Sequence, residues 1–260
     1  MRDLAFALAR RRELLFAFAI RDFKIRYYSV KLGVLYAFGV SLLTMTVLSV
    51  VLGRVFRDAV PGSYALFVFA ALIPWNFLSF SLNQSTDSFR LSAAIVRKVP
   101  FPRELVPLGV VAANALNMLI SFVAFVPIAL LLGVRPLWTW LALPLAVLAL
   151  ATLTAGLAML VATVGVFYVE VKPVMEVLVM LWFYATPVFY PESVVPERFL
   201  WVVRSNPMAH LVDVFRGLLV FGRLPTLGSV AYPAAVALVA LVAGWRVLRK
   251  YEGVIADSVG

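Results

Sequence analysis

Six long apolar stretches alternate with short polar segments along this chain of 260 residues. An α-helix rises about 1.5 Å per residue, so about 20 apolar residues cross the roughly 30 Å hydrocarbon core of a bilayer. The pattern therefore predicts an all-α integral membrane protein with six transmembrane helices. The expected spans cover residues 33–53, 64–82, 105–132, 138–166, 174–190 and 227–247.

The stretch 192–223 follows a different pattern. Its apolar segments, 199–203 and 208–221, are each too short to cross, and charged residues interrupt the stretch. Asn206-Pro207 between them is a turn signal, because proline disfavours helix in the residue before it. We expect a short re-entrant helical hairpin between spans five and six. A full crossing by 208–221 would instead place the C-terminal cations outside the cell.

The segment before the first span, residues 1–31, is expected to form a cytoplasmic arm. Within it, Phe16, Ile20, Phe23 and Tyr27 recur at helical spacing, with charged residues beside and behind them. This pattern is typical of an interfacial helix that lies in the membrane plane. An amphipathic helix packed on a soluble partner is the alternative.

The composition agrees with a membrane protein, since 63% of the residues are hydrophobic and only 14% are charged. These values lie far from soluble globular usage. We therefore treat residues 1–260 as a single transmembrane domain. The chain has no cysteine, which excludes disulfides and thiolate metal sites within it.

The distribution of Lys and Arg predicts the orientation. With six spans and a cytoplasmic N-terminus, sixteen of the 23 Lys and Arg residues lie on the inside, as the positive-inside rule requires. Both termini are then cytoplasmic. The net charge of +10 is explained by this topology and by contact with anionic membrane lipids, so nucleic acid is not an expected partner.

Motifs for catalysis or for an independent energy source are missing from the sequence. It contains no G-x-x-x-x-G-K-[ST] motif, so we expect no nucleotide cofactor in this chain and no ATPase site. His210 is the single histidine, and its simplest interpretation is an interfacial polar residue. Glu176 is the one ionisable residue expected within a span, near Lys172 at its cytoplasmic start. The spans therefore offer little for coupling transport to an ion gradient.

Aromatic residues gather in the second and fifth expected spans. Aromatic faces stack on the apolar faces of sugar rings, so these residues are candidates for a substrate channel. The alternative is the ordinary aromatic belt at the membrane surface. The channel candidates are Trp75, Phe77, Phe183, Tyr184, Phe189 and Tyr190.

Several short segments stand in order along this frame. They are RDFKIRY at 21–27, LGVL at 32–35, LIPWNF at 72–77, KVPFPRE at 98–104, VP at 106–107, WFYATPVFYP at 182–191, VPE at 195–197 and NPM at 206–208. Together, from about residue 15 to 250, the chain resembles the membrane (permease) subunit of polysaccharide ABC exporters, the ABC-2 class that moves O-antigen, capsule or teichoic-acid chains. One departure is the loop 167–171, where the family usually has an arginine–aspartate pair.

The resemblance implies partners and roles for residues. Members form homodimers and pair with two separate ATP-binding ABC subunits, which would bind the ATP and Mg²⁺. In relatives the outer hairpin forms a gate, which here implies Trp201, Asn206 and Pro207. The arm and first inner loop contact the ATPase. The implied coupling residues, whose cations could also be plain positive-inside anchors, are Arg21, Arg26, Arg90, Arg97, Lys98, Arg103 and Glu104.

The sequence thus predicts a membrane-spanning subunit of an exporter that carries a lipid-linked polysaccharide across the bacterial inner membrane, without enzyme activity of its own. An ABC exporter of a small molecule, a drug or another lipid-linked glycan such as teichoic acid is the first alternative. A membrane-embedded enzyme or scaffold is the second, and it would need clustered catalytic groups within the spans, which the sequence does not show.

Overall fold

The computed structural model describes residues 19–20, 33–94, 101–134 and 138–258, apart from the side chains of 33–38 and 256–258. Every regular element in these residues is a helix, which confirms the prediction of an all-helical chain. The elements are α3 (Gly33–Leu52), α4 (Tyr64–Ser85), α5 (Ser88–Leu91), α7 (Leu105–Leu131), η1 (Trp138–Ala142), α8 (Leu143–Phe167), α9 (Val171–Ala185), η2 (Glu192–Val194), η3 (Glu197–Phe199), α10 (Leu200–Arg204), α11 (Pro207–Arg216), η4 (Gly217–Phe221) and α12 (Leu227–Ser258).

Four helices in the described residues are long and apolar enough to cross a membrane. They comprise Tyr64–Ser85, Leu105–Leu131, Trp138–Phe167 and Leu227–Ile255. Helix α3 offers a shorter apolar segment, Gly39–Leu52, and α9 has 15 residues. The structure therefore supports a membrane protein with at least these four candidate spans, and the first and fifth of the six expected spans stay a prediction.

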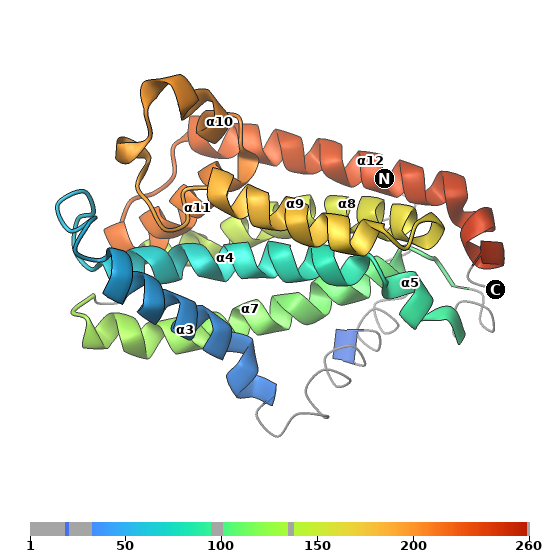
Figure 1. Ribbon diagram of the computed structural model, residues 1–260, viewed down its shortest axis with the longest axis horizontal. Helices are drawn as coiled ribbons and strands as arrows, with labels where there is room; N and C mark the ends of the chain where they lie inside the picture. Colours follow the sequence, from blue (N-terminus) through green and yellow to red (C-terminus); the bar gives the residue numbers. More distant parts are fainter. Residues whose placement is uncertain (1–18, 21–32, 95–100, 135–137, 259–260) are drawn as a thin grey trace.

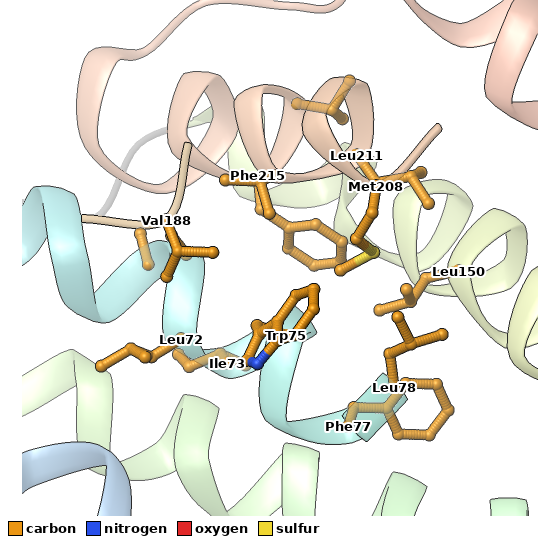
Figure 2. Close-up of a cluster of buried hydrophobic side chains, with 14 of the residues drawn as sticks. Leu72, Ile73, Trp75, Phe77, Leu78, Leu150, Val188, Met208, Leu211 and Phe215 are labelled. Carbon is orange, nitrogen blue, oxygen red and sulfur yellow. The ribbon is translucent and has the colours of Figure 1, made fainter. Parts of the chain in front are cut away.

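Helix α4 lies at the centre of the fold, because α3, α7, α8, α9 and α11 all pack against it. Most of its side chains are buried, including Pro74 in its middle. Figure 2 shows Trp75 lying against Met208 and Phe215 of α11. A helix that is apolar all round is expected in such an interior position. The channel candidates on α4 are therefore placed inside the protomer.

Among the described helices, α8 and α12 make the most extensive contact with each other, and glycines allow their close approach. A Cβ atom on Gly156 would collide with the backbone of Ala240, and one on Gly244 would collide with the carbonyl oxygen of Gly156. Without side chains at the crossing, the two backbones touch directly, as small residues permit in membrane helices. The pair runs along most of the length of the molecule (Figure 1).

Two groups of segments lie at opposite ends of the molecule (Figure 1). The α3–α4 loop, α10 and α11 form what we name the hairpin end. Helix α5, the start of α7 and the C-terminal part of α12 form what we name the loop end. The predicted interfacial helix lies outside the described residues except for Ala19 and Ile20.

The stretch 192–223 contains two short helices, α10 and α11, followed by the π-helical turn η4. Asn206 caps the N-terminus of α11, with Pro207 in its first turn. Proline is well suited to that position, because its missing N–H would have no partner there. The turn expected from Asn206-Pro207 is thus a helix cap. How deeply the two helices enter the membrane stays a prediction.

Candidate functional site

Aromatic rings from the end of α9 and the following turn form one cluster. Thr186 has extended backbone, as expected for a residue before proline, so α9 ends at Ala185 and the chain folds back. This brings the Phe189 ring to 5.6 Å from the Phe183 ring and 5.0 Å from the Tyr190 ring, between centroids. Tyr190 Oη also donates a hydrogen bond to the Tyr184 carbonyl oxygen.

Trp75 of α4 extends this cluster into the core. Its ring centroid lies 5.4 Å from that of Phe183 and 6.1 Å from that of Trp182. We name the six residues the aromatic cluster; they are Trp75, Trp182, Phe183, Tyr184, Phe189 and Tyr190. Five of the six predicted channel residues therefore lie together, and Trp182 joins them.

Phe77 does not belong to the aromatic cluster. It lies two residues after Trp75, about 200° around the helix, and Figure 2 places it beside Leu78, away from Met208 and Phe215. Exposure also differs within the cluster: Tyr184 is 58% exposed and Trp75 only 4%. In this conformation Tyr184 is the member most available to a ligand, and Trp75 supports it from inside.

Asn206 connects the end of α9 with the start of α11 through four hydrogen bonds. Its Oδ1 accepts from Trp182 Nε1 at 2.9 Å and from the Met208 backbone N–H at 3.0 Å. Its Nδ2 donates to Thr186 Oγ1 at 2.9 Å and to the Ala185 carbonyl at 3.3 Å. An amide side chain can accept two hydrogen bonds and donate two, so this buried group makes all the hydrogen bonds it can. The predicted gate residue Asn206 thus fixes the hairpin against the aromatic cluster.

The other two predicted gate residues have different surroundings. Pro207 begins α11, whereas Trp201 of α10 is 68% exposed. His210, expected to be an interfacial polar residue, has its Nε2 2.8 Å from the Arg204 carbonyl oxygen and its ring against Tyr232 of α12. The exposed Trp201 is therefore the gate candidate that can meet lipid, cargo or a second chain.

Arg216, one of the charged residues that interrupt the stretch 192–223, is a central residue that was not among the predicted site residues. It is buried, and its Nε and Nη2 donate to the carbonyl oxygens of Phe67 (3.0 Å) and Val188 (2.6 Å). Its guanidinium carbon lies 3.5 Å from the Phe67 ring centroid. Arg216 therefore ties α11 to α4 and to the turn after α9. A lone cation near the end of an apolar segment was the available signal, because such residues are rarely placed there without a partner.

At the loop end, the predicted coupling residue Glu104 is fully buried and binds within the chain. Its Oε1 accepts a hydrogen bond from Arg249 Nη2 of α12 at 2.9 Å, and Arg249 Nη1 also contacts Glu252 at 3.0 Å. Arg90 and Arg103 are partly exposed, and Arg103 lies over the Phe101 ring. The remaining coupling candidates, Arg21, Arg26, Arg97 and Lys98, lie outside the described residues.

A second ion pair at this end joins the first turn of α9 to Asp87, the residue directly before α5. Lys172 Nζ lies 2.7 Å from Asp87 Oδ2, so Lys172 pairs with Asp87. The hydrogen bond that Lys172 donates to this carboxylate, together with the negative charge of Asp87, raises the pKa of Lys172 above its ordinary value. The loop 167–171, which departs from the exporter pattern in sequence, is therefore still held to the first inner loop by the residue that follows it.

Comparison with known proteins identifies related chains over nearly the whole length. The ABC-2 type transporter family matches residues 13–220. An O-antigen export system permease protein RfbA from Klebsiella pneumoniae is 30% identical over 213 residues, which cover 82% of each chain. One from Myxococcus xanthus is 28% identical over 250 residues, or 95% of this chain and 96% of the relative. The polysialic acid transport protein KpsM from Escherichia coli is 22% identical over 248 residues, or 93% and 95%.

Proposed function

This chain belongs to the ABC-2 type transporter family, and we propose that it is the membrane subunit of an ATP-driven exporter that moves a lipid-linked polysaccharide across the bacterial inner membrane. Relatives named for O-antigen export and polysialic acid transport align with at least 82% of this chain. This alignment over nearly the whole domain is the observation that carries the proposal. The chain is then a transport subunit and no enzyme.

The assembly we propose contains two copies of this chain and two ATP-binding ABC subunits. The sequence has no P-loop, so ATP hydrolysis requires a partner. The apolar side chains of α9 are largely uncovered in one protomer; Val174, Val177, Leu178, Met180 and Leu181 are each about half exposed. A face of this kind suits a second copy, lipid or a channel lumen.

The topology that we propose has six spans, with α3 and α9 added to the four long apolar helices. Both termini face the cytoplasm, so the hairpin end faces outward and the loop end faces inward. Helices α10 and α11 form the re-entrant hairpin. The balance of Lys and Arg between the two sides supports this orientation.

The aromatic cluster is proposed to line the path of the glycan. Tyr184 is exposed beside Phe183, Phe189 and Tyr190, and such rings can stack on sugars of differing identity. Trp75 would hold Phe183 in place from the core. Phe77 faces elsewhere in this conformation and has no proposed contact with cargo.

The hairpin is proposed to act as the outer gate, and the loop end as the coupling surface for the ATPase. Asn206 and Pro207 would set the position of α11, and Trp201 would present an exposed ring at the channel mouth. Arg90, Arg97, Lys98 and Arg103, with Arg21 and Arg26 of the arm, would meet the ATPase. Because Glu104 is buried, its proposed part is to position the coupling loop.

The channel role is tested by replacing both tyrosines of the aromatic cluster together, with Tyr184→Ala and Tyr190→Ala. Loss of two stacking rings should lower export about tenfold. The measurement is cell-surface polysaccharide in a strain that depends on this gene, with copurification of the ATPase as the check on assembly. Tyr168→Ala is the matched control, since Tyr168 is exposed but lies in the loop before α9. Unchanged export in the double variant would remove the channel role.

A further inference from the structure

A cavity of about 240 Å³ opens at the hairpin end, where five segments converge. Its walls come from the α3–α4 loop, α4, the turn after α9, the α10–α11 hairpin and the residues after η4. This volume is far larger than a single water requires. The charged and titratable groups that line it are Glu192, Arg204, His210, Asp213, Arg216 and Arg223.

Arg216 lines the cavity, and one nitrogen of its guanidinium group makes no hydrogen bond to the described residues. Its Nε and Nη2 donate to neutral carbonyl oxygens, while Nη1 donates no hydrogen bond within the described residues. The side chain is 96% buried, since only 4% of the residue is exposed. Asp213, one turn earlier in α11, attracts this cation but forms no direct ion pair with it, so the buried charge is only partly compensated. An anion in the cavity would supply a further counter-charge.

Arg223 adds a second cation to the same cavity. It contacts the Phe221 ring, and its backbone N–H donates to the Gly217 carbonyl, but it has no ion pair among the described residues. Arg204 is the third cation, and its Nε lies 3.7 Å from Glu192 Oε1. Asp213, one turn before Arg216 in α11, makes no ion pair within the part of the chain described. The cavity therefore has one more cation than carboxylate, and two of its guanidiniums, those of Arg216 and Arg223, form no direct ion pair among the described residues.

We propose that this cavity binds a phosphate group. Arginine forms planar, charge-assisted hydrogen bonds with phosphate oxygens, and phosphate offers more acceptor oxygens than a carboxylate to donors that approach from different segments. Arg216 would contribute Nη1, and Arg223 would close over the ligand from the residues after η4. The phosphate could belong to a lipid headgroup or be free in solution.

Binding is measured on the full chain purified alone in a detergent without phosphate, because a partner ATPase would bind phosphate itself. In the first arm, inorganic pyrophosphate is added and the melting temperature is compared with that in sodium chloride of equal ionic strength. In the second arm, the chain is placed in nanodiscs of phosphatidylglycerol or of a neutral galactolipid, whose headgroup has no phosphate. A neutral disaccharide is the control for ligands without charge.

We expect pyrophosphate to raise the melting temperature in a saturable manner, and Arg223→Gln to weaken its apparent affinity about tenfold. Arg57→Gln, which removes an exposed cation in the α3–α4 loop outside the cavity lining, should leave that affinity unchanged. Stabilisation in both arms shows that the phosphate group suffices, whereas stabilisation only by phosphatidylglycerol assigns the site to a lipid headgroup.

Three results would overturn the proposal: no stabilisation beyond that of salt in either arm, an equal effect of the disaccharide, or full stabilisation retained in Arg223→Gln. Because Arg223 is exposed, its substitution does not disturb the buried contacts of Arg216. The inference stands apart from export, since the measurement uses neither cargo nor ATPase.

Discussion

The polar networks at the two ends of the molecule differ in how completely their hydrogen bonds are made. At the hairpin end, Asn206 makes four hydrogen bonds, two through each end of its amide. At the loop end, Glu104 Oε2, Arg249 Nε and Trp245 Nε1 are buried without a partner among the described residues. A buried polar group without a hydrogen bond costs about 1–3 kcal/mol. The Asn206 network of the hairpin end is thus complete in one chain, and the Glu104–Arg249 network of the loop end is not.

This difference agrees with the roles that we propose for the two ends. A gate hairpin can be set by contacts within its own chain, whereas a coupling surface has to gain contacts when the ATPase binds. In the sequence, Glu104 follows the cations Arg97 and Lys98 by six or seven positions, and it binds Arg249. We therefore expect the loop end to become more stable in the assembled transporter, and the hairpin end to change little.

Helix α12 joins the two ends physically. Near its start, Tyr232 Oη donates a hydrogen bond to the Ser205 carbonyl of the hairpin, and near its end Arg249 binds Glu104. Between them, Gly244 touches the backbone of Gly156 in α8. A displacement at either end is therefore constrained by the α8–α12 contact.

The largest expected effect comes from breaking this connection with Gly244→Leu. A side chain at this position would collide with the Gly156 backbone, so the two helices have to separate. We expect a loss of about 3–5 kcal/mol of unfolding free energy. Equilibrium unfolding in mixed micelles of detergent and sodium dodecyl sulfate measures it. Gly253→Leu, in the same helix but with open space around its Cβ position, is the control. Equal stability of the two variants would contradict the close packing.

The next largest effect is expected at the hairpin end, from Asn206→Leu. This substitution removes all four hydrogen bonds of the amide and leaves Trp182 Nε1 and the Met208 N–H without their acceptor. We expect a loss of about 2–3 kcal/mol, measured by the same unfolding titration. Asn206→Asp retains an acceptor for both donors and should fall between wild type and Asn206→Leu. A Leu variant as stable as wild type would show that the network contributes nothing.

Whether the sequence could predict a feature depends on how far apart along the chain the residues that form it lie. Hydrophobic periodicity and length predicted helices, and the turn signal at Asn206 marked a helix cap, because both are local properties. The separation of Phe77 from Trp75 was also readable from helical spacing. The Glu104–Arg249 pair joins residues 145 positions apart, and the carbonyl partners of Arg216 come from α4 and the turn after α9. Such contacts depend on the packing of whole helices, which no local pattern specifies.

A smaller effect is expected at the loop end, from Glu104→Leu. Only one of the two carboxylate oxygens of Glu104 accepts a hydrogen bond within the described residues. Without Glu104, Arg249 would keep Glu252 as a partner, and its side chain is about one-third exposed to solvent. We expect a loss of about 1 kcal/mol in the isolated chain, below that of Asn206→Leu. The affinity for the partner ATPase, measured by surface-immobilised binding, should fall in this variant and stay unchanged in Asn206→Leu.

Glu252→Leu is the matched control for that experiment, because it removes the same charge from the other side of Arg249. It should change ATPase affinity less than Glu104→Leu, since Glu104 directly precedes α7 and fixes the inner loop. If both variants, or Asn206→Leu, weakened ATPase binding equally, the contrast between the two ends would be lost.

The smallest effect is expected for the Lys172–Asp87 pair, which is partly exposed to solvent. Solvent screens such pairs, so a double-mutant cycle with Lys172→Met and Asp87→Asn should give a coupling of about 0.5 kcal/mol or less. Because Asp87 raises the pKa of Lys172, this coupling is present below pH 10.5 and is lost as the pH rises through the raised pKa. Unfolding cycles from about pH 8 to successively higher pH test this, and a coupling that rises with pH would contradict it. A coupling as large as the loss in Asn206→Leu would show that the loop end is held as firmly within one chain as the hairpin end.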